Sequence, residues 1–283
     1  MQQYGQKIFR PLLQLPDVYY IDVESEHEFD HWKTQLSPDI VVYNYYSGAT
    51  MPWLTPGKVA AQRSQFKQAG IFHELPLESM GFDRVIHQDP TEGGIPRPIP
   101  QHPLSAQITD MPTFGSFGFG LGGKGFRRVV EEVGRTYARA RVRLNIPFAH
   151  FGDKDGAGAR AYLADCQRVA GDSTELVVTH ELMDEARLVA WLSEHTANCF
   201  FYDDNYGRGL TGTLDYALAA QRPIAITRSW QFKHMWRPEL LIDETPLQSI
   251  VNAGIEPLKP FYAVWGDAAL RAAFVTIFEE MLS

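Results

Sequence analysis

A glycine-rich turn with one lysine, GFGLGGKGFRR at residues 118–128, has residue types and spacing suited to binding phosphate. Gly118, Gly120 and Gly123 match the dinucleotide pattern GxGxxG, and Lys124 follows as in the P-loop pattern GxxxxGK[ST]. The residue after the lysine is glycine, however, where a P-loop needs Ser or Thr, and no acidic residue stands about 20 residues later to bind a ribose. Both motifs share free backbone N–H groups and the positive end of a helix, so we expect a bound phosphate; a plain strand-to-helix turn is the alternative.

Two pairs of polar residues stand at the ends of predicted strands, where an open parallel α/β sheet places its ligands. His73 and Glu74 lie in the strand-like segment 70–75, and a histidine or a glutamate at such a position can move a proton to or from a hydroxyl. His180 and Glu181 follow a predicted strand in the second half of the chain. We expect both pairs near bound ligands, with a surface position or helix capping as the alternatives.

An aromatic-rich segment at 44–54 follows another predicted strand. Tyr45, Tyr46 and Trp53 could stack on a sugar or another ring. Aromatic side chains near a strand end are also commonly part of a core, so both interpretations are kept.

Acidic residues and cysteines raise the question of a metal site. Asp203 and Asp204 follow a predicted strand and as a pair could bind Mg²⁺, whereas DKDG at 153–156 lacks the further acidic ligands of a calcium loop. Cys166 and Cys199 form no CxxC pair. We expect no resident metal and no disulfide framework.

The first part of the chain alternates strand-like and helix-like segments. Segments rich in β-branched and aromatic residues at 18–23 and 39–46 flank an amphipathic segment at 26–36. A further helix and two short strands continue the βαβ rhythm up to residue 88. This rhythm is typical of a parallel sheet covered by helices.

A segment of five prolines and two glycines at 90–103 interrupts the rhythm and is the best candidate for a linker. After it a strand enters the glycine turn, three further pairs of a strand and a helix follow, and a last strand closes the series. The helix after the turn has one apolar face, formed by Phe126, Val129, Val130 and Val133.

Two such series joined by a linker predict an α/β fold of two facing Rossmann-like domains with parallel sheets covered by helices. The expected domains are 1–103 and 104–283. The last helix, predicted over 266–283, is assigned to the second domain with Asp267 as its N-cap, although the pattern does not say what its apolar face packs against.

The bulk composition excludes some functions. A net charge of −8 argues against a protein that binds nucleic acid through the phosphates of its backbone. No apolar run approaches the roughly 18 to 20 residues of a membrane span, and the first residues lack the features of a secretory signal. We therefore expect a cytoplasmic protein without a membrane span.

Two segments carry a resemblance to a known family. The segment FGSFGFGLGGKGFRRVVEEV at 114–133 resembles the opening of the donor-binding domain in glycosyltransferases of the GT-B fold, similar to their family 4. The segment 200–227, with Pro223, is similar in layout to a later conserved loop of those enzymes. The resemblance implies a metal-independent glycosyltransferase without a cofactor, which moves a sugar from a nucleotide-sugar donor such as a UDP-sugar to a hydroxyl acceptor.

The resemblance also implies roles for particular residues. His73 or Glu74 would face the sugar or activate the acceptor hydroxyl. Lys124 would offset the diphosphate charge, Arg208 would replace a basic residue that the family has at position 118, and Asp215 would bind the ribose. The full set of expected donor contacts is Gly120, Gly122, Gly123, Lys124, Gly125, His180, Glu181, Tyr202, Arg208, Gly209 and Asp215.

Three departures from the family leave two alternatives open. Position 118 is glycine, the ribose-binding acid is displaced to Asp215, and Met1 stands where a first strand would precede the first loop. The alternatives are a non-catalytic GT-B-like protein that binds a nucleotide or a glycan, and a sugar-nucleotide epimerase of the same two-domain shape.

Overall fold

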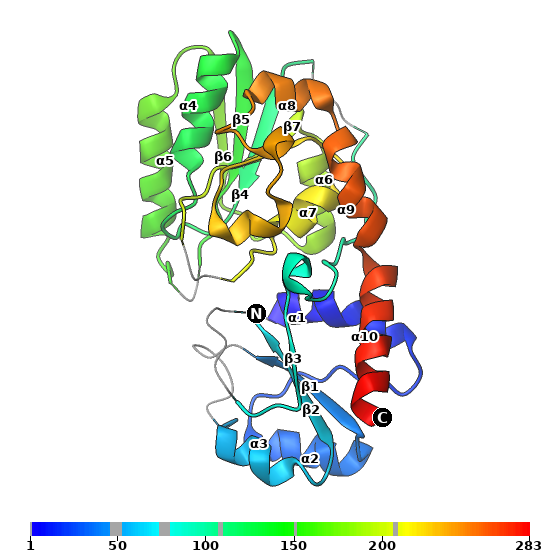
Figure 1. The fold of residues 1–283 in the computed structure, drawn as a ribbon. Coiled ribbons are helices and arrows are strands. Elements are labelled where there is room, and N and C mark those ends of the chain that lie inside the picture. The colour runs from blue at the N-terminus through cyan, green and yellow to red at the C-terminus, as the bar shows by residue number, and fades with distance from the viewer. Residues whose placement is uncertain (1, 46–52, 74–79, 107–109, 150–151, 206–208) are drawn as a thin grey trace. The chain divides into compact units, whose positions relative to one another are not determined.

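The computed structural model describes residues 2–45, 53–73, 80–106, 110–149, 152–205 and 209–283 (Figure 1). The chain divides into two compact units. Unit 1 contains Met1–Pro98, Gly207–Leu210 and Val264–Ser283, and unit 2 contains Ile99–Tyr206 and Thr211–Ala263.

Unit 1 is built on a three-stranded parallel sheet in the order β1-β2-β3. Its strands are β1 (Ile40–Tyr45), β2 (Lys67–Phe72) and β3 (Arg84–Ile86). Its α-helices are α1 (Gln2–Phe9), α2 (Glu26–Leu36), α3 (Pro56–Gln62) and α10 (Asp267–Leu282), and its 3₁₀ turns are η1 (Arg10–Gln14) and η2 (Pro90–Glu92).

Local signals explain where two helices of unit 1, α2 and α3, begin. The Ser25 hydroxyl accepts a hydrogen bond from the Glu28 N–H at the start of α2, and the Thr55 hydroxyl accepts one from the Lys58 N–H at the start of α3. The predicted strand over 18–23 is wrong, because this segment joins no sheet. Its β-branched and aromatic residues indicate that the segment is half-buried, and they do not indicate that it pairs with a strand.

The C-terminal helix α10 packs on unit 1. Its residues Leu270, Phe274, Ile277 and Met281 share one hydrophobic cluster with residues of α1 and of strands β2 and β3. The division predicted at residue 103 placed this helix in the second domain, so the observed units differ from it there. Gly266, not Asp267, is the N-cap residue of α10, and no side chain caps this helix.

The same helix belongs to a segment apolar enough for a membrane span. Within the described residues, Glu256–Leu282 contains an 18-residue window of mean hydropathy 1.3, enough for a span by length and composition alone, although Asp267 and Arg271 interrupt its apolar residues. This segment is divided among η5 (Glu256–Leu258), α9 (Lys259–Val264) and α10. The apolar face of α10 contributes to the core of unit 1.

Unit 2 is built on a five-stranded parallel sheet in the order β6-β5-β4-β7-β8. Its strands are β4 (Thr113–Phe117), β5 (Ala140–Asn145), β6 (Thr174–Thr179), β7 (Ala197–Phe200) and β8 (Ile224–Ile226). Its helices are α4 (Phe126–Thr136), α5 (Ala157–Val169), α6 (Glu185–Ser193), α7 (Thr213–Ala219), α8 (Leu247–Ala253) and α9, with 3₁₀ turns η3 (Trp230–Met235) and η4 (Pro238–Leu240).

Helix α4 shows how the sequence positions the glycine turn. The predicted apolar face is confirmed, since Phe126, Val129, Val130 and Val133 are all buried in the main core cluster of unit 2. Residues of α5 and α8 belong to the same cluster, so these helices pack on the sheet together with α4. The chain segment between β4 and α4 is thereby held between a central strand and a helix whose apolar face is buried (Figure 1).

The proline-rich segment does not behave as a simple linker. Ile95 is buried in the core of unit 1, and the Arg97 carbonyl accepts a hydrogen bond of 2.9 Å from the Gly266 N–H. Further along, His102 contacts Glu185 of α6 at 2.8 Å, and both belong to unit 2. The first part of the segment therefore belongs to unit 1 and the second part to unit 2.

Candidate functional site

The glycine turn connects β4 to α4 and depends on glycine at particular positions. Gly123 and Gly125 have φ angles of 82° and 62°, a left-handed conformation that other residues rarely adopt. A Cβ atom on Gly125 would lie 1.9 Å from the carbonyl oxygen of Phe201, and no atom lies within 4 Å of the equivalent position at Gly122. The backbone at Gly125 can therefore approach the end of β7 closely only because this residue is glycine.

Lys124 lies against the segment that follows β7. Its ammonium group is 4.1 Å from the centre of the Tyr202 ring, which is a cation–π contact, and the carbonyl of Gly123 accepts a 3.0 Å hydrogen bond from the Asp203 N–H. Two expected donor contacts, Lys124 and Tyr202, are thus brought together. The Tyr202 hydroxyl is 3.1 Å from the Thr213 hydroxyl, and the Tyr202 side chain is 1% exposed. This contact and the burial together fix the orientation of the Tyr202 ring.

Tyr162 of α5 also contacts the glycine turn. It is not among the residues predicted from the sequence. Its hydroxyl donates a 3.0 Å hydrogen bond to the Leu121 carbonyl. Burial raises the pKa of Tyr162, an effect opposed by the backbone N–H groups of Lys124 and Gly123.

Gly120 and Asp153 fit the turn against the start of α5. A Cβ atom on Gly120 would lie 2.4 Å from the Ala159 nitrogen, so this glycine allows close packing. The Asp153 carboxylate accepts hydrogen bonds from the N–H groups of Gly158 at 2.8 Å and Ala159 at 3.0 Å. Asp153 is thus used to satisfy a helix start, a role that DKDG did not reveal in the sequence.

The two aspartates after β7 have different surroundings. The Asp204 carboxylate accepts a 3.1 Å hydrogen bond from the Trp230 N–H at the start of η3, while the Asp203 carbonyl accepts one of 2.9 Å from the Ser229 hydroxyl. Both side chains are exposed. Among the described residues, no group of three or more His, Cys, Asp or Glu side chains could hold a metal ion.

His180 and Glu181 lie at the end of β6. The Nδ1 atom of His180 is 2.8 Å from the Ile146 carbonyl, so it donates there, and the His180 ring lies 5.0 Å from that of Phe148. Glu181 forms an ion pair with Arg187. Asp184, not either of these residues, caps α6.

Two of the three remaining expected donor contacts, Asp215 and Gly209, lie within the described residues. Asp215 lies in the first turn of α7 and is 0% exposed, so it offers no surface to a ribose in this conformation. Gly209 is partly exposed. Arg208 lies outside the described residues, and the donor roles of all three stay predictions.

In unit 1, His73 follows β2 directly and lies in a polar cluster at the carboxyl ends of the three strands. Its Nε2 contacts the Asn44 side-chain oxygen, and its Nδ1 is 2.8 Å from the Gln88 side-chain nitrogen. Burial, assisted by the positive charge of Arg97, lowers the pKa of His73 to about 4. The ring is therefore neutral near pH 7, and Glu74 lies outside the described residues.

Two of the predicted acceptor residues, Tyr45 and Trp53, belong to or pack against one core cluster of unit 1. Tyr45 is buried, with its ring 4.9 Å from that of Phe72, and the Trp53 ring is 5.1 Å from that of Phe29. This is the core position that the sequence left open as an alternative. Tyr46 lies outside the described residues, so an acceptor role for these aromatics stays a prediction.

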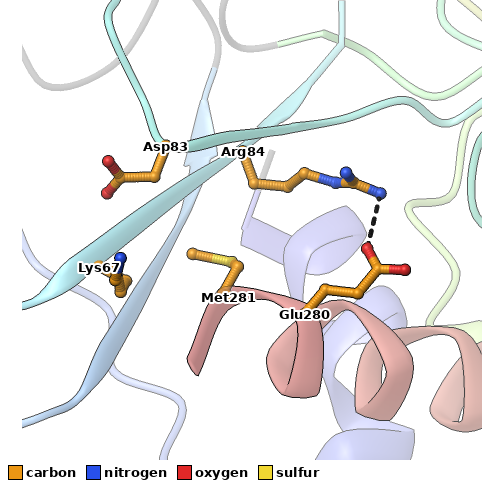
Figure 2. Close-up of a pocket in the computed structure, with 5 residues that line it drawn as sticks. All are labelled: Lys67, Asp83, Arg84, Glu280 and Met281. Atoms are coloured by element: carbon orange, nitrogen blue, oxygen red, sulfur yellow. Dashed lines mark ion pairs between the residues drawn. The ribbon is translucent and has the colours of Figure 1, made fainter. Parts of the chain in front are cut away.

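A small pocket in unit 1 lies at the other end of the sheet (Figure 2). It has a volume of about 190 Å³ and is lined by Lys67, Asp83, Arg84, Glu280 and Met281, with an ion pair of 3.3 Å between Arg84 and Glu280. Lys67 and Arg84 are the first residues of their strands. Ligands of open parallel sheets bind at the carboxyl ends, so this pocket is not the candidate site.

No protein-family model and no curated protein matches the chain. Solved structures do. The chain is similar to a sucrose-phosphate synthase from Thermosynechococcus elongatus, with 15% identity, a TM-score of 0.59, and coverage of 95% of this chain and 82% of that chain. It is similar to AviGT4, a glycosyltransferase involved in avilamycin A biosynthesis, with 12% identity, a TM-score of 0.63 and coverage of 99% and 89%.

A third similar structure is a UDP-forming α,α-trehalose-phosphate synthase from Burkholderia xenovorans in complex with glucose-6-phosphate. The identity is 9%, the TM-score 0.57 and the coverage 99% of this chain and 82% of that chain. At these identities the likeness concerns the fold, and it extends over both units. The chain has the fold of the GT-B glycosyltransferases.

Proposed function

We propose that this protein is a glycosyltransferase that moves a sugar from a nucleoside-diphosphate sugar to a hydroxyl acceptor. The observation that carries the proposal is the position of Lys124, which follows a left-handed glycine at the start of α4 and lies over Tyr202 at the end of the neighbouring strand β7. We propose that the diphosphate leaving group develops its charge beside this cation.

The chemistry assigned to the turn is electrostatic. Breaking the bond between the sugar and the phosphate leaves negative charge on the diphosphate, and a fixed cation with backbone N–H donors stabilises it. We assign this role to the Lys124 ammonium and the N–H groups of Gly122, Gly123 and Gly125. The first turn of α4 adds the positive end of a helix. Because these groups supply the positive charge, we propose a transfer that needs no metal.

The donor nucleotide is proposed to be UDP. The carboxyl end of β6 lies two strands away from that of β4 in the same sheet, and there His180 and Phe148 form a paired aromatic surface. A nucleobase could stack on such a surface. The similar trehalose-phosphate synthase is UDP-forming, and its likeness of fold supports the same choice.

The acceptor side is assigned to unit 1. His73 lies at the carboxyl end of a parallel sheet, in the first unit of the same fold, and is largely buried among polar groups that orient it. We propose that it faces the transferred sugar. The acceptor is a hydroxyl compound, and the protein is proposed to act in the cytoplasm.

One observation favours a non-catalytic binding protein as the second candidate. The only acidic residue that the sequence offered for the ribose, Asp215, is fully buried. Without that contact a nucleotide would be held mainly through its phosphates, which suits a sensor as well as an enzyme. An epimerase remains a third candidate, distinguished by its product.

The test combines binding with turnover. Calorimetric titration with UDP, GDP and ADP identifies the nucleotide, and the matching nucleotide-sugars are then incubated with the protein and a panel of sugar acceptors. A released nucleoside diphosphate together with a glycosylated acceptor supports the transferase. Binding without release supports the sensor, and an isomerised nucleotide-sugar supports the epimerase.

A further inference from the structure

Four polar side chains of unit 1 form a continuous hydrogen-bonded chain at the carboxyl end of the sheet. They run from Arg97 through Gln88 to His73 and end on Asn44. Asn44 belongs to β1, His73 follows β2, and Gln88 follows β3 by two residues. The chain therefore crosses all three strands of the sheet.

Arg97 determines which way the Gln88 amide points. Its Nη1 donates to the Gln88 carbonyl at 3.3 Å and to the Gln88 Oε1 at 3.2 Å. A guanidinium group has donors only, so the side-chain atom facing it must be the amide oxygen. Arg97 is itself 1% exposed and its carbonyl is bonded to the Gly266 N–H, which fixes it in place.

The orientation of Gln88 in turn determines where His73 carries its proton. The Gln88 Nε2 donates to the Phe72 carbonyl at 3.1 Å and lies 2.8 Å from the Nδ1 of His73. An amide nitrogen can only donate, so this Nδ1 must accept with its lone pair. The single proton of the neutral ring is then on Nε2, which donates to the Asn44 Oδ1.

We propose that Arg97 and Gln88 are positioning residues that hold His73 as the neutral tautomer protonated on Nε2, so that it meets its ligand as a hydrogen-bond donor and not as a base. The assignment of the tautomer stands on geometry alone. The identity of the ligand as an oxygen of the transferred sugar rests on the proposed function. The lowered pKa of His73 agrees, since a ring that resists protonation keeps its lone pair on Nδ1.

The consequence for the chemistry is specific. Neither nitrogen of His73 is free to take a proton from an acceptor hydroxyl, because Nε2 already carries one and Nδ1 faces an N–H group of Gln88. A sugar oxygen can instead replace Asn44 as the partner of Nε2–H. Of the two roles considered for His73, facing the sugar is therefore favoured over activating the acceptor.

The test is nitrogen-15 NMR of the full chain labelled at histidine. Correlations between ring nitrogens and ring protons distinguish the two neutral tautomers and the charged ring, and His73→Gln identifies which of the 9 histidine signals belongs to His73. The expected spectrum at pH 7 is that of a ring protonated on Nε2 only. A ring protonated on Nδ1, a charged ring, or a rapid mixture of tautomers would overturn the proposal.

Two matched variants test whether Gln88 is the cause. Gln88→Glu places an acceptor against Nδ1, so His73 is expected to move its proton to Nδ1 or to become charged. Gln62→Glu puts the same substitution at another buried glutamine of unit 1, 3% exposed against 7% for Gln88, and is expected to leave the His73 signals unchanged. Unchanged signals in Gln88→Glu would contradict the role of Gln88; if that variant does not fold, the wild-type spectrum alone decides.

This experiment is independent of the proposed activity. The spectra need no nucleotide, so a protein that transfers no sugar but shows the expected tautomer would refute the function and leave the positioning chain intact. A protein that transfers sugar with His73 protonated on Nδ1 would refute the positioning chain alone.

Discussion

The ammonium group of Lys124 lies 4.1 Å from the centre of the Tyr202 ring, and this contact joins the glycine turn to the end of the next strand in the sheet. The pair comes from two motifs that are far apart in the sequence. The contact places a positive charge at the carboxyl edge of unit 2, where a doubly wound sheet binds its ligands.

Lys124→Ala is expected to lower turnover with a nucleotide-sugar by about a hundredfold, because removing a group that stabilises developing charge has effects of this size. The measurement is kcat with the donor identified by calorimetry. Lys154→Ala removes an exposed lysine from the same unit and is the matched control, expected to leave kcat unchanged. Equal turnover in wild type and Lys124→Ala would exclude the leaving-group role.

Tyr202→Leu is expected to weaken UDP binding by about 0.5 to 2 kcal/mol, since it removes the aromatic face that holds the Lys124 ammonium. Tyr202→Phe keeps the ring and loses only the contact with the Thr213 hydroxyl, so it should weaken binding less. Calorimetric titration with UDP compares the two. An equal loss in both variants would show that the hydroxyl, and not the ring, matters.

Gly125→Ala is expected to destabilise the protein severely. The left-handed backbone alone costs about 1 to 3 kcal/mol for a residue with a side chain, and the added Cβ would also meet the Phe201 carbonyl at 1.9 Å. Gly122→Ala in the same turn meets nothing within 4 Å and should change the free energy of unfolding little. Urea denaturation measures both, and similar stabilities would contradict the described conformation of the turn.

The free energy of unfolding is expected to fall as the pH is lowered from about 6.5. Burial lowers the pKa of His73 to about 4 and that of His195 to about 3, so between those values and the ordinary value of 6.5 the unfolded chain binds more protons than the folded one. Stability is therefore lost on acidification through this window, at up to about 1.4 kcal/mol per pH unit for each histidine.

Urea denaturation at a series of pH values measures this slope. His195→Gln should reduce it, whereas His27→Gln changes an exposed histidine and should leave it unchanged. A slope that is identical in wild type and His195→Gln would contradict the neutral buried state of His195.

The elements that could be predicted from the sequence are those whose signals are local. The apolar face of α4, from Phe126 to Val133, is confirmed because its period alone determines which side is buried. The parallel sheets follow from the order of such elements, whereas the GT-B fold was expected from the resemblance of the segments 114–133 and 200–227 to that family. The strand predicted over residues 18–23 is wrong because strand-like composition does not specify a pairing partner.

Other features depend on contacts between distant residues. The face of α10 was visible in the sequence, but nothing local says that it packs with Ile8 and Ile71 of unit 1. The hydrogen-bonded series of side chains from Arg97 through Gln88 to His73 exists only because the segments after two strands meet at the carboxyl end of the sheet. Asp215 looked like a ligand residue, and only the structure shows that it is buried.

The central claim is that the glycine turn of unit 2 binds a diphosphate. A crystal structure of the protein with UDP tests it most directly. The account predicts phosphate oxygens within hydrogen-bond distance of the Lys124 ammonium and of N–H groups at the start of α4. UDP bound with its phosphates elsewhere, or a turn free of phosphate at saturating UDP, would contradict it.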